Sequence, residues 1–510
     1  MNGRATAAAL TVAVAIALGL RLWALADDPP AFFEDELSGA VSAWRIATTG
    51  SDVGPTHLPF LTTRLELKQP VYFALTLPTQ ALLGTTALAT RLPAAFLGAA
   101  GVLLIWWVAR ALELGRGTAL VAAALFGVLP WAVHYGRVGW EPAAMLPFTL
   151  AGVALLCEGL RLRRPRRIVA AAAVLALGAY AYHPALAANA VLAVVVVAIR
   201  WRHAVRRQAV IALAVAGAVA VAILVPYVAT WASEPLFTAR AHLLWVFEKG
   251  VDRAAIDRAF DGYMAHWDWR ELVRDAGPDL RTSPGRAPLY AFVLPFLAVG
   301  AFALLRDRRP SYRVLIAWLL LAPLSGALMQ EPGPVSIEWS RSLAFLAAVT
   351  LTTAFGLATA LEAARRWRPR LRITAAAVLV IVASIEVSGF VGDYFGEYPR
   401  RSAAAWHDGA GRALAAARET VPDGGLLCVD SRWYFTYTFP QQAALYLEPR
   451  RFSVIEGWWT GWDERCGQPG AHILTVAGLS FPMPVTAVRT TYDITGAPRF
   501  VEVVVAEAAR

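Results

Sequence analysis

Three consecutive carboxylates, Glu34, Asp35 and Glu36, are the first feature of the sequence that could do chemistry. They follow the first apolar segment, where a chain would leave a bilayer, and they open a stretch with apolar residues at helical spacing. This pattern predicts a short helix on the membrane surface. A carboxylate at its start could act as a general base. Acidic residues in a first helical turn also interact favourably with the helix dipole, so capping is the alternative interpretation.

Other ionisable side chains fall at about the same predicted depth. Such residues are costly in a membrane, and they usually face a cavity and act there. Lys68 stands out because the chain has two lysines against 45 arginines, and a lysine offers phosphate a compact point charge. The full set is Asp35, Glu36, Glu66, Lys68, Arg137, Glu141, His183, Glu338 and Arg341.

Several of these residues also have ordinary structural interpretations. Arg137 precedes an apolar segment and could anchor it at the interface, and Arg341 could snorkel from a helix end. Glu141 stands before a proline and could cap the helix that begins there. His183, in an Ala-Tyr-Ala-Tyr-His-Pro stretch, could be a hydrogen-bonded turn histidine.

The sequence lacks the motifs of several other chemistries. It contains no glycine-rich phosphate loop at a strand-to-helix junction, no Cys-x-x-Cys pair and no nucleophile elbow. Nucleotide-driven transport and a nucleotide cofactor are therefore excluded from the expected functions.

The elements that must position these residues are membrane helices. Of the 510 residues, 57% are hydrophobic and 16% are charged, whereas soluble proteins carry about a quarter charged residues. We predict eleven spans of the length that a bilayer requires. Their approximate limits are 7–26, 91–109, 118–133, 142–160, 168–182, 185–199, 210–231, 289–305, 314–329, 342–360 and 373–390.

The net charge of +10 is a topology signal, because the arginines gather in alternate short loops. By the positive-inside rule these loops and the N-terminus face the cytoplasm of a plasma-membrane protein, and the C-terminus faces outward. No nucleic-acid partner is expected, since the segment after residue 392 is slightly acidic. The arginine-rich loops are 110–116, 161–167, 200–207, 306–313 and 365–372.

Two domains follow from this topology. We predict an α-helical polytopic membrane domain over 1–391 and a small external α/β domain over 392–510. The outer loops 27–90 and 232–288 are long; the first holds a 14-residue apolar stretch at 71–84 that suits an interfacial helix, and the second contains Arg240. In the external domain we expect a helix near 403–419 and strands near 425–429, 452–455, 473–477 and 500–506. An oxidising compartment would permit a disulfide between Cys428 and Cys466.

Four short motifs occur in a fixed order: Asp35-Glu36, a Glu-Leu-Lys-Gln-Pro-Val-Tyr run at 66–72, Arg-Leu-Pro-Ala-Ala at 91–95, and an arginine-to-acid segment at 137–141. With these motifs the chain resembles integral-membrane glycosyltransferases of the GT-C type. The resembling branch contains the protein O-mannosyltransferases and the lipid A aminoarabinose transferases. The resemblance is strongest over residues 10–160, followed by 340–357 and 394–399.

The resemblance implies roles for individual residues. Asp35, beside Glu36, would be the catalytic base, and Lys68, Arg137 and Arg341 would hold the donor phosphate. Acceptor or divalent-cation binding (Mg²⁺, Mn²⁺ or Zn²⁺) would fall to Glu66 and Glu141. Further candidates are Tyr72, His183, Arg240 and Glu338. The chain departs from the family where Tyr182-His183-Pro184 leads to alanine and leucine in place of an arginine, and where a histidine is missing near Glu338.

These features predict a hexosyl- or pentosyltransferase that takes a sugar from a polyprenyl-phosphate donor. The acceptor would be a hydroxyl of a glycan, lipid or protein on the external face, attacked in a single inverting displacement. The alternatives are a transporter of polyprenyl lipids or small solutes and a noncatalytic partner in envelope assembly. Interrupted inverted repeats would favour a transporter, and none is evident.

Overall fold

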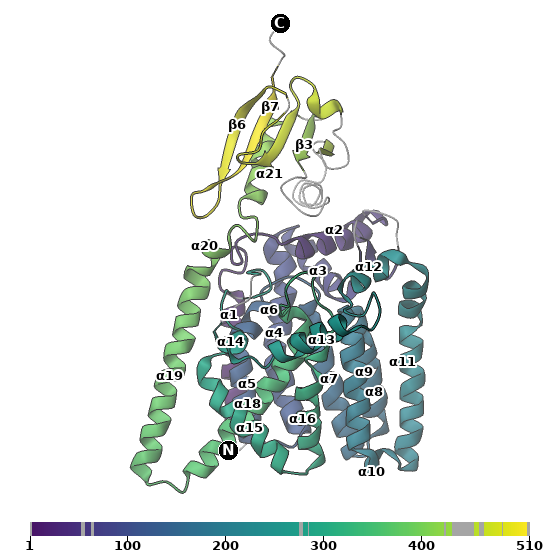
Figure 1. Ribbon diagram of the computed structural model, residues 1–510, viewed down its shortest axis with the longest axis vertical. Coiled ribbons are helices and arrows are strands. Elements are labelled where there is room, and N and C mark those ends of the chain that lie inside the picture. The colour runs from purple at the N-terminus through teal and green to yellow at the C-terminus, as the bar shows by residue number, and fades with distance from the viewer. Residues whose placement is uncertain are drawn as a thin grey trace. The chain divides into compact units, whose positions relative to one another are not determined.

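The computed structural model describes residues 3–52, 57–62, 66–274, 279–283, 285–422, 425–430, 453–457, 464–481 and 483–506. Its contacts divide the chain into two compact units. Figure 1 labels the helices and strands. Unit 1 comprises Met1–Trp23 and Ala94–Asp393, and unit 2 comprises Ala24–Pro93 and Tyr394–Arg510. The first long loop therefore groups with the C-terminal segment.

Unit 1 is built from helices. The longer ones are α1 (Gly3–Leu22), α4 (Ala87–Ala111, which starts in unit 2), α5 (Arg116–Val128), α7 (Pro142–Arg161), α8 (Pro165–Leu177), α9 (His183–Ile199), α11 (Arg207–Ser233), α15 (Leu294–Arg306), α16 (Pro310–Leu321), α18 (Leu343–Ala364) and α19 (Pro369–Gly396). Shorter helices join them: α6 (Pro130–Tyr135), η1 (Gly178–Tyr180), α10 (Trp201–Ala204), α12 (Pro235–Leu244), α13 (Arg253–Ala265), α14 (Trp269–Val273), η2 (Ala291–Val293), α17 (Leu324–Ala327) and η3 (Trp339–Ser342).

Each of the eleven predicted spans overlaps one of the longer helices. Among the residues that the structure describes, six helices are long and apolar enough to cross a membrane, namely α1, α4, α7, α11, η3 with α18, and α19. The other five, α5, α8, α9, α15 and α16, have 12 to 17 residues. Prolines explain several of these shorter lengths, because proline ends a helix before it and can begin the next one. Pro130, for example, starts α6 directly after α5.

Helices α15 and α18 approach each other through glycine. A methyl group added at Gly300 would collide with the Thr352 carbonyl oxygen, and one added at Gly356 would collide with the Phe296 carbonyl oxygen. Small residues let helix backbones pack this closely in membrane proteins. The two glycines therefore fix the distance between these helices.

Three of the arginine-rich loops meet in unit 1. The buried Arg200 guanidinium donates to Ser311 Oγ at 2.8 Å, and Ser311 Oγ donates to a Glu113 carboxylate oxygen at 2.5 Å. These contacts join three of the loops that the sequence placed on one side of the membrane. The side of the membrane on which these loops lie stays a prediction.

Unit 2 contains the first loop and a C-terminal sheet. The loop forms α2 (Glu34–Thr49), β1 (Leu61–Thr62), β2 (Leu67–Lys68) and α3 (Pro70–Leu83). The C-terminal part forms α20 (Tyr398–Ser402), α21 (Ala410–Thr420), β3 (Leu426–Asp430), β4 (Ser453–Gly457), η5 (Glu464–Gly467), β5 (His472–Val476), β6 (Val485–Tyr492) and β7 (Pro498–Val505). At 14 residues, α3 is about 21 Å long.

The C-terminal sheet has the strand order β4-β3-β5-β7-β6. Strand β3 pairs in parallel with β4 and β5, while β7 runs antiparallel to β5 and β6. The sequence predicted four of these strands and the helix α21, but not β6. Among the described strands β6 pairs with β7 alone, and its side chains are half-buried or exposed. It therefore has little hydrophobic signal in the sequence, and it was not predicted.

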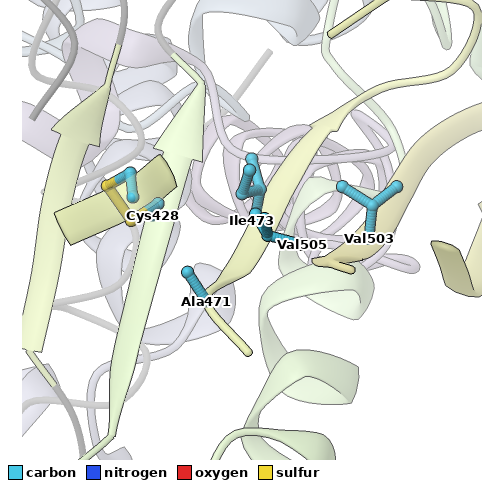
Figure 2. Close-up of a cluster of buried hydrophobic side chains, with 6 residues drawn as sticks. Cys428, Ala471, Ile473, Val503 and Val505 are labelled. Carbon is cyan, nitrogen blue, oxygen red and sulfur yellow. A yellow bond between two sulfur atoms is a disulfide. The ribbon is translucent and has the colours of Figure 1, made fainter. Parts of the chain in front are cut away.

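A small core stabilises this sheet (Figure 2). Ile473 of β5 packs with Val503 and Val505 of β7. The disulfide Cys428–Cys466 joins β3 to η5 in the same core, with the two Cα atoms 5.8 Å apart. The pairing that the sequence left open is thus present.

Candidate active site

The acidic stretch forms the first turn of α2 as predicted. Glu34, Asp35 and Glu36 occupy that turn, and the Phe33 amide donates to a Glu36 carboxylate oxygen at 3.1 Å. This bond satisfies a backbone amide that the helix itself leaves without a partner. The helix ends at Gly50, whose φ of 73° lies in the left-handed region that glycine adopts readily.

Glu36 is fully buried against Arg91 at the start of α4. The guanidinium donates from Nε to one carboxylate oxygen and from a terminal nitrogen to the other, both at 3.0 Å. It also donates to the Pro29 and Ala31 carbonyl oxygens. This bidentate pair ties the start of α2 to α4. Its contacts favour a positioning role for Glu36, so the predicted catalytic role is not the one that its surroundings support.

Asp35, one residue earlier, faces a different set of groups. Lys68 Nζ lies 2.6 Å from an Asp35 carboxylate oxygen and 3.0 Å from a Glu66 carboxylate oxygen. The Lys68 side chain is 4% exposed, whereas those of Asp35 and Glu66 are 29% and 28% exposed. The fold thus brings together three residues that the sequence predicted as site residues. The buried Lys68 ammonium lies between two carboxylates that solvent reaches.

The β1–β2 hairpin positions Lys68. Lys68 pairs with Leu61, and the next pair is Thr62 with Leu67. Thr62 is held twice, since its amide donates to Asp52 at 2.7 Å and its carbonyl oxygen accepts from Ser42 Oγ of α2 at 2.9 Å. The same helix thus carries Asp35 and supports the strand pair that presents Lys68.

Tyr72, in the same motif, has a structural contact. Its hydroxyl donates to the Thr90 carbonyl oxygen at 2.7 Å, and its side chain is fully buried. This bond joins α3 to α4.

A second polar cluster lies in unit 1 around Glu331. The Arg341 guanidinium donates to Glu331 Oε1 at 2.6 Å, and the Arg240 guanidinium donates to the same oxygen at 2.7 Å. Arg341 also donates to the Met329 carbonyl oxygen. The fold therefore brings together two predicted arginines through an acid that the sequence analysis missed. Glu331 gave no sequence signal, because it is a single acid in a loop, ten residues before its partner.

Glu338 lies at the start of η3 beside this cluster. Its carboxylate accepts a hydrogen bond from the Ser340 amide at 3.3 Å, and Ser340 Oγ lies 3.3 Å from the Tyr182 hydroxyl. Burial raises the pKa of Glu338 above its ordinary value, and the nearby Arg341 partly offsets this rise.

Arg137 is fully buried and contacts the end of α1. Its guanidinium donates to the carbonyl oxygens of Leu20, Arg21 and Trp23 at 2.8 to 3.1 Å. A cation here satisfies the last carbonyls of the helix and interacts favourably with its dipole. These contacts favour a structural role over phosphate binding.

Glu141 and His183 also occupy packed positions. Glu141 is 5% exposed and directly precedes α7, which begins at Pro142. His183 Nδ1 contacts the Tyr227 hydroxyl, and its ring lies 4.6 Å from that of Phe237. The contacts of His183 agree with the alternative interpretation from the sequence, a hydrogen-bonded histidine.

Two buried histidines that the sequence did not indicate make contacts in or to the described part of the loop 232–288. His266 Nδ1 lies 2.8 Å from the Gly262 carbonyl oxygen and Nε2 lies 2.7 Å from Ser342 Oγ. Because a carbonyl only accepts, Nδ1 carries the proton and Nε2 accepts from Ser342. Burial lowers the pKa of His266 to about 4. His134 Nε2 similarly contacts the Arg281 carbonyl oxygen at 2.9 Å.

Comparison with solved structures identifies the architecture. The crystal structure of ArnT from Cupriavidus metallidurans in the apo state matches with a TM-score of 0.62 at 14% sequence identity, over 98% of each chain. The same protein bound to undecaprenyl phosphate matches with a TM-score of 0.59 at 15% identity, over 96% of this chain and 97% of that chain. The chain has the GT-C fold. The GT-C fold predicted from the sequence motifs is thereby confirmed.

An oligosaccharyltransferase shares this GT-C fold. The Archaeoglobus fulgidus enzyme, tethered with an acceptor peptide, matches with a TM-score of 0.57 at 12% identity, over 93% of this chain and 69% of that chain. Another structure of that enzyme, in complex with Zn and sulfate, matches with a TM-score of 0.53 at 15% identity, over 87% and 62%. No protein-family model and no curated protein matches the sequence.

Proposed function

We propose that this protein is a glycosyltransferase that moves a sugar from a polyprenyl-phosphate donor to an acceptor hydroxyl. Two observations support the proposal: the GT-C fold it shares with a transferase solved with undecaprenyl phosphate, and the Asp35–Lys68–Glu66 cluster. The cluster is the observation that carries it. It places a carboxylate that solvent reaches beside a cation able to receive a departing phosphate.

In this proposal Asp35 is the general base and Lys68 binds the donor phosphate. In the free protein the Lys68 ammonium is shared between Asp35 and Glu66. A bound phosphate would draw Nζ toward itself, because a doubly or singly charged phosphate competes with a carboxylate for the ammonium. The Asp35 oxygen released in this way can accept the proton of the acceptor hydroxyl. Donor binding would therefore precede acceptor activation.

The remaining residues take supporting roles. Glu66 retains contact with Lys68 or orients the acceptor, and Glu36 with Arg91 fixes the start of α2. Arg341 is a separate candidate for phosphate in unit 1, where a phosphate would replace Glu331 between two arginines. Arg137 stays with the end of α1.

The proposed mechanism assigns no step to a divalent cation. Among the described residues, no group of three or more His, Cys, Asp or Glu side chains is arranged to hold a metal ion. Between the two carboxylates of the cluster, the space a cation would need is taken by the Lys68 ammonium. An oligosaccharyltransferase of the same fold was solved in complex with Zn and sulfate, and a divalent cation remains a candidate ligand of Asp35 and Glu66 once the Lys68 ammonium moves away.

We propose that the loop 27–90 and the C-terminal segment face the outside of the cell. The positive-inside rule assigns the arginine-rich loops to the cytoplasm, and eleven spans that start there leave the C-terminus outside. The disulfide Cys428–Cys466 agrees with this orientation, because disulfides persist in oxidising compartments.

The test uses a polyprenyl-phosphate sugar labelled in the sugar, with purified protein and a cell-envelope extract as acceptor. We expect Asp35→Asn to lower the transfer rate by about a hundredfold or more, since removal of a general base costs this much. Glu34→Gln, in the same helical turn, is the matched control and should retain activity. Both variants are checked for native unfolding temperature.

The same assay separates the competing functions. A transferase releases free polyprenyl phosphate in proportion to the labelled acceptor, whereas a transporter moves the lipid without cleaving it. A folded Asp35→Asn protein with wild-type transfer would overturn the assignment of the base. Absence of any acceptor-dependent release from the wild-type protein would overturn the transferase itself.

A further inference from the structure

A groove between α8 and α11 is the surface feature that the proposed function leaves unexplained. The two helices lie side by side in unit 1 (Figure 1). The groove has a volume of about 840 Å³. It is lined by Pro165, Arg166, Val169, Ala170, Ala173, Gln208, Ile211, Ala212 and Val215.

The groove has one polar end and an apolar length. Arg166 and Gln208 belong to the first turns of α8 and α11, while the other lining residues lie further along both helices. From Pro165 to Ala173 the wall extends about 12 Å. Alanines at three lining positions leave the space for a narrow, flexible chain. This shape suits an acyl chain that enters from the polar end.

The polar end carries a concentration of positive charge. Arg163, Arg164, Arg166, Arg206 and Arg207 are exposed at the starts of the two helices. Within the described part of the chain, no carboxylate forms an ion pair with any of them. Arg167, by contrast, is paired with Glu158. The starts of both helices also bring their positive dipole ends to this place.

Some arginines on neighbouring loops have acidic partners, whereas others in the described part of the chain, such as Arg366 and Arg368, are exposed without an ion pair. Arg309 pairs with Asp307 and lies over the Tyr312 ring, and Arg365 pairs with Glu362. The positive-inside rule accounts for arginines on all of these loops, but it does not account for the position of this cluster at the mouth of an apolar groove. Charge and shape together point to one ligand.

We propose that this groove binds an anionic phospholipid of the leaflet on the arginine-rich side. The phosphate would contact Arg166 and Gln208, with the neighbouring arginines adding attraction, and one acyl chain would occupy the groove between α8 and α11. Basic residues near a membrane surface attract anionic lipids in this manner. The site involves neither Asp35 nor Lys68, so it stands independently of the proposed transferase activity.

The test measures lipid binding to the full-length protein in detergent by native mass spectrometry, with phosphatidylglycerol and phosphatidylcholine as probes. We expect preferential retention of one phosphatidylglycerol. Arg166→Gln should weaken it about fivefold, the effect of losing one arginine near an anionic headgroup. Ala173→Trp, which fills the groove, should reduce the bound phosphatidylglycerol while leaving the headgroup contacts in place.

Arg313→Gln is the control, because it removes an equally exposed arginine on a different loop of the same side. Glycerol 3-phosphate, which lacks the acyl chains, should not displace the lipid. Equal retention of the two lipids by the wild-type protein would overturn the proposal. So would equal weakening by Arg166→Gln and Arg313→Gln, which would indicate a diffuse charge effect, or displacement by glycerol 3-phosphate, which would indicate a simple phosphate site.

Discussion

The buried pair between Glu36 and Arg91 leads to the sharpest prediction, because its removal leaves one charge without a partner. Both side chains are fully buried, and two hydrogen bonds of 3.0 Å join them. Two unit charges about 4 Å apart attract each other by about 4 kcal/mol at an effective dielectric constant of 20. Breaking a buried pair by removing one partner costs about 3–5 kcal/mol.

We therefore expect Arg91→Leu to destabilise α2 by about 3–5 kcal/mol. Glu36→Gln should cost less, because Arg91 would keep its bonds to Pro29 and Ala31 and its position 5.8 Å from the Trp406 ring. The double variant should cost less than the sum of the two single changes, since the coupling between contacting charges is counted twice in that sum.

Amide hydrogen exchange of α2 measures this effect directly, because protection reports the free energy of local opening. Protection in Arg91→Leu should fall by about two to four orders of magnitude, at about 1.4 kcal/mol for each tenfold change. Arg110→Leu is the control, since it removes a charge from the far end of the same helix. A fall of less than tenfold in Arg91→Leu, or strict additivity in the double variant, would refute this account of how α2 is held.

Three further predictions concern stability. Gly356→Ala should lower the unfolding temperature, because overpacking against the Phe296 carbonyl costs about 1–3 kcal/mol. Gly217→Ala is the control and should have no such effect, since Gly217 has open space around it. Equal effects of the two changes would contradict the packing argument. Because the pKa of His266 is about 4 in the folded protein and about 6.5 when unfolded, only the unfolded chain gains this proton as pH falls between those values. Stability should thus decrease by up to about 3 kcal/mol from pH 6.5 to 4, and thermal melts of His266→Gln should show less of this loss; identical pH profiles would argue against it. Replacing Cys428 and Cys466 by serine should destabilise the sheet by about 4 kcal/mol for a separation of 38 residues, as measured by proteolysis of the C-terminal segment, and unchanged resistance would show that the bond is dispensable.

The strong hydrophobic segments made the helical architecture predictable. Bilayer-length apolar runs and alternating arginine loops depend on local composition, so the sequence located all eleven helices. It also located α2, α3 and α21, whose patterns are local. The edge strand β6 was not predicted, because its environment is set by pairing with β7.

The candidate site, like the fold, was predictable from the sequence only in part. Residue type and order alone singled out Asp35, Glu66 and Lys68, and the structure places them within one ion-pair cluster. Only the tertiary structure shows that Glu36 forms an ion pair with Arg91, 55 positions away, and that Arg137 caps the end of α1. It alone revealed Glu331 between two arginines. The physical reason is that the type of a charged residue, and so its possible chemistry, can be read from the sequence. Its interaction partner depends on which distant chain segments pack together in the fold, and that partner determines whether the residue can react.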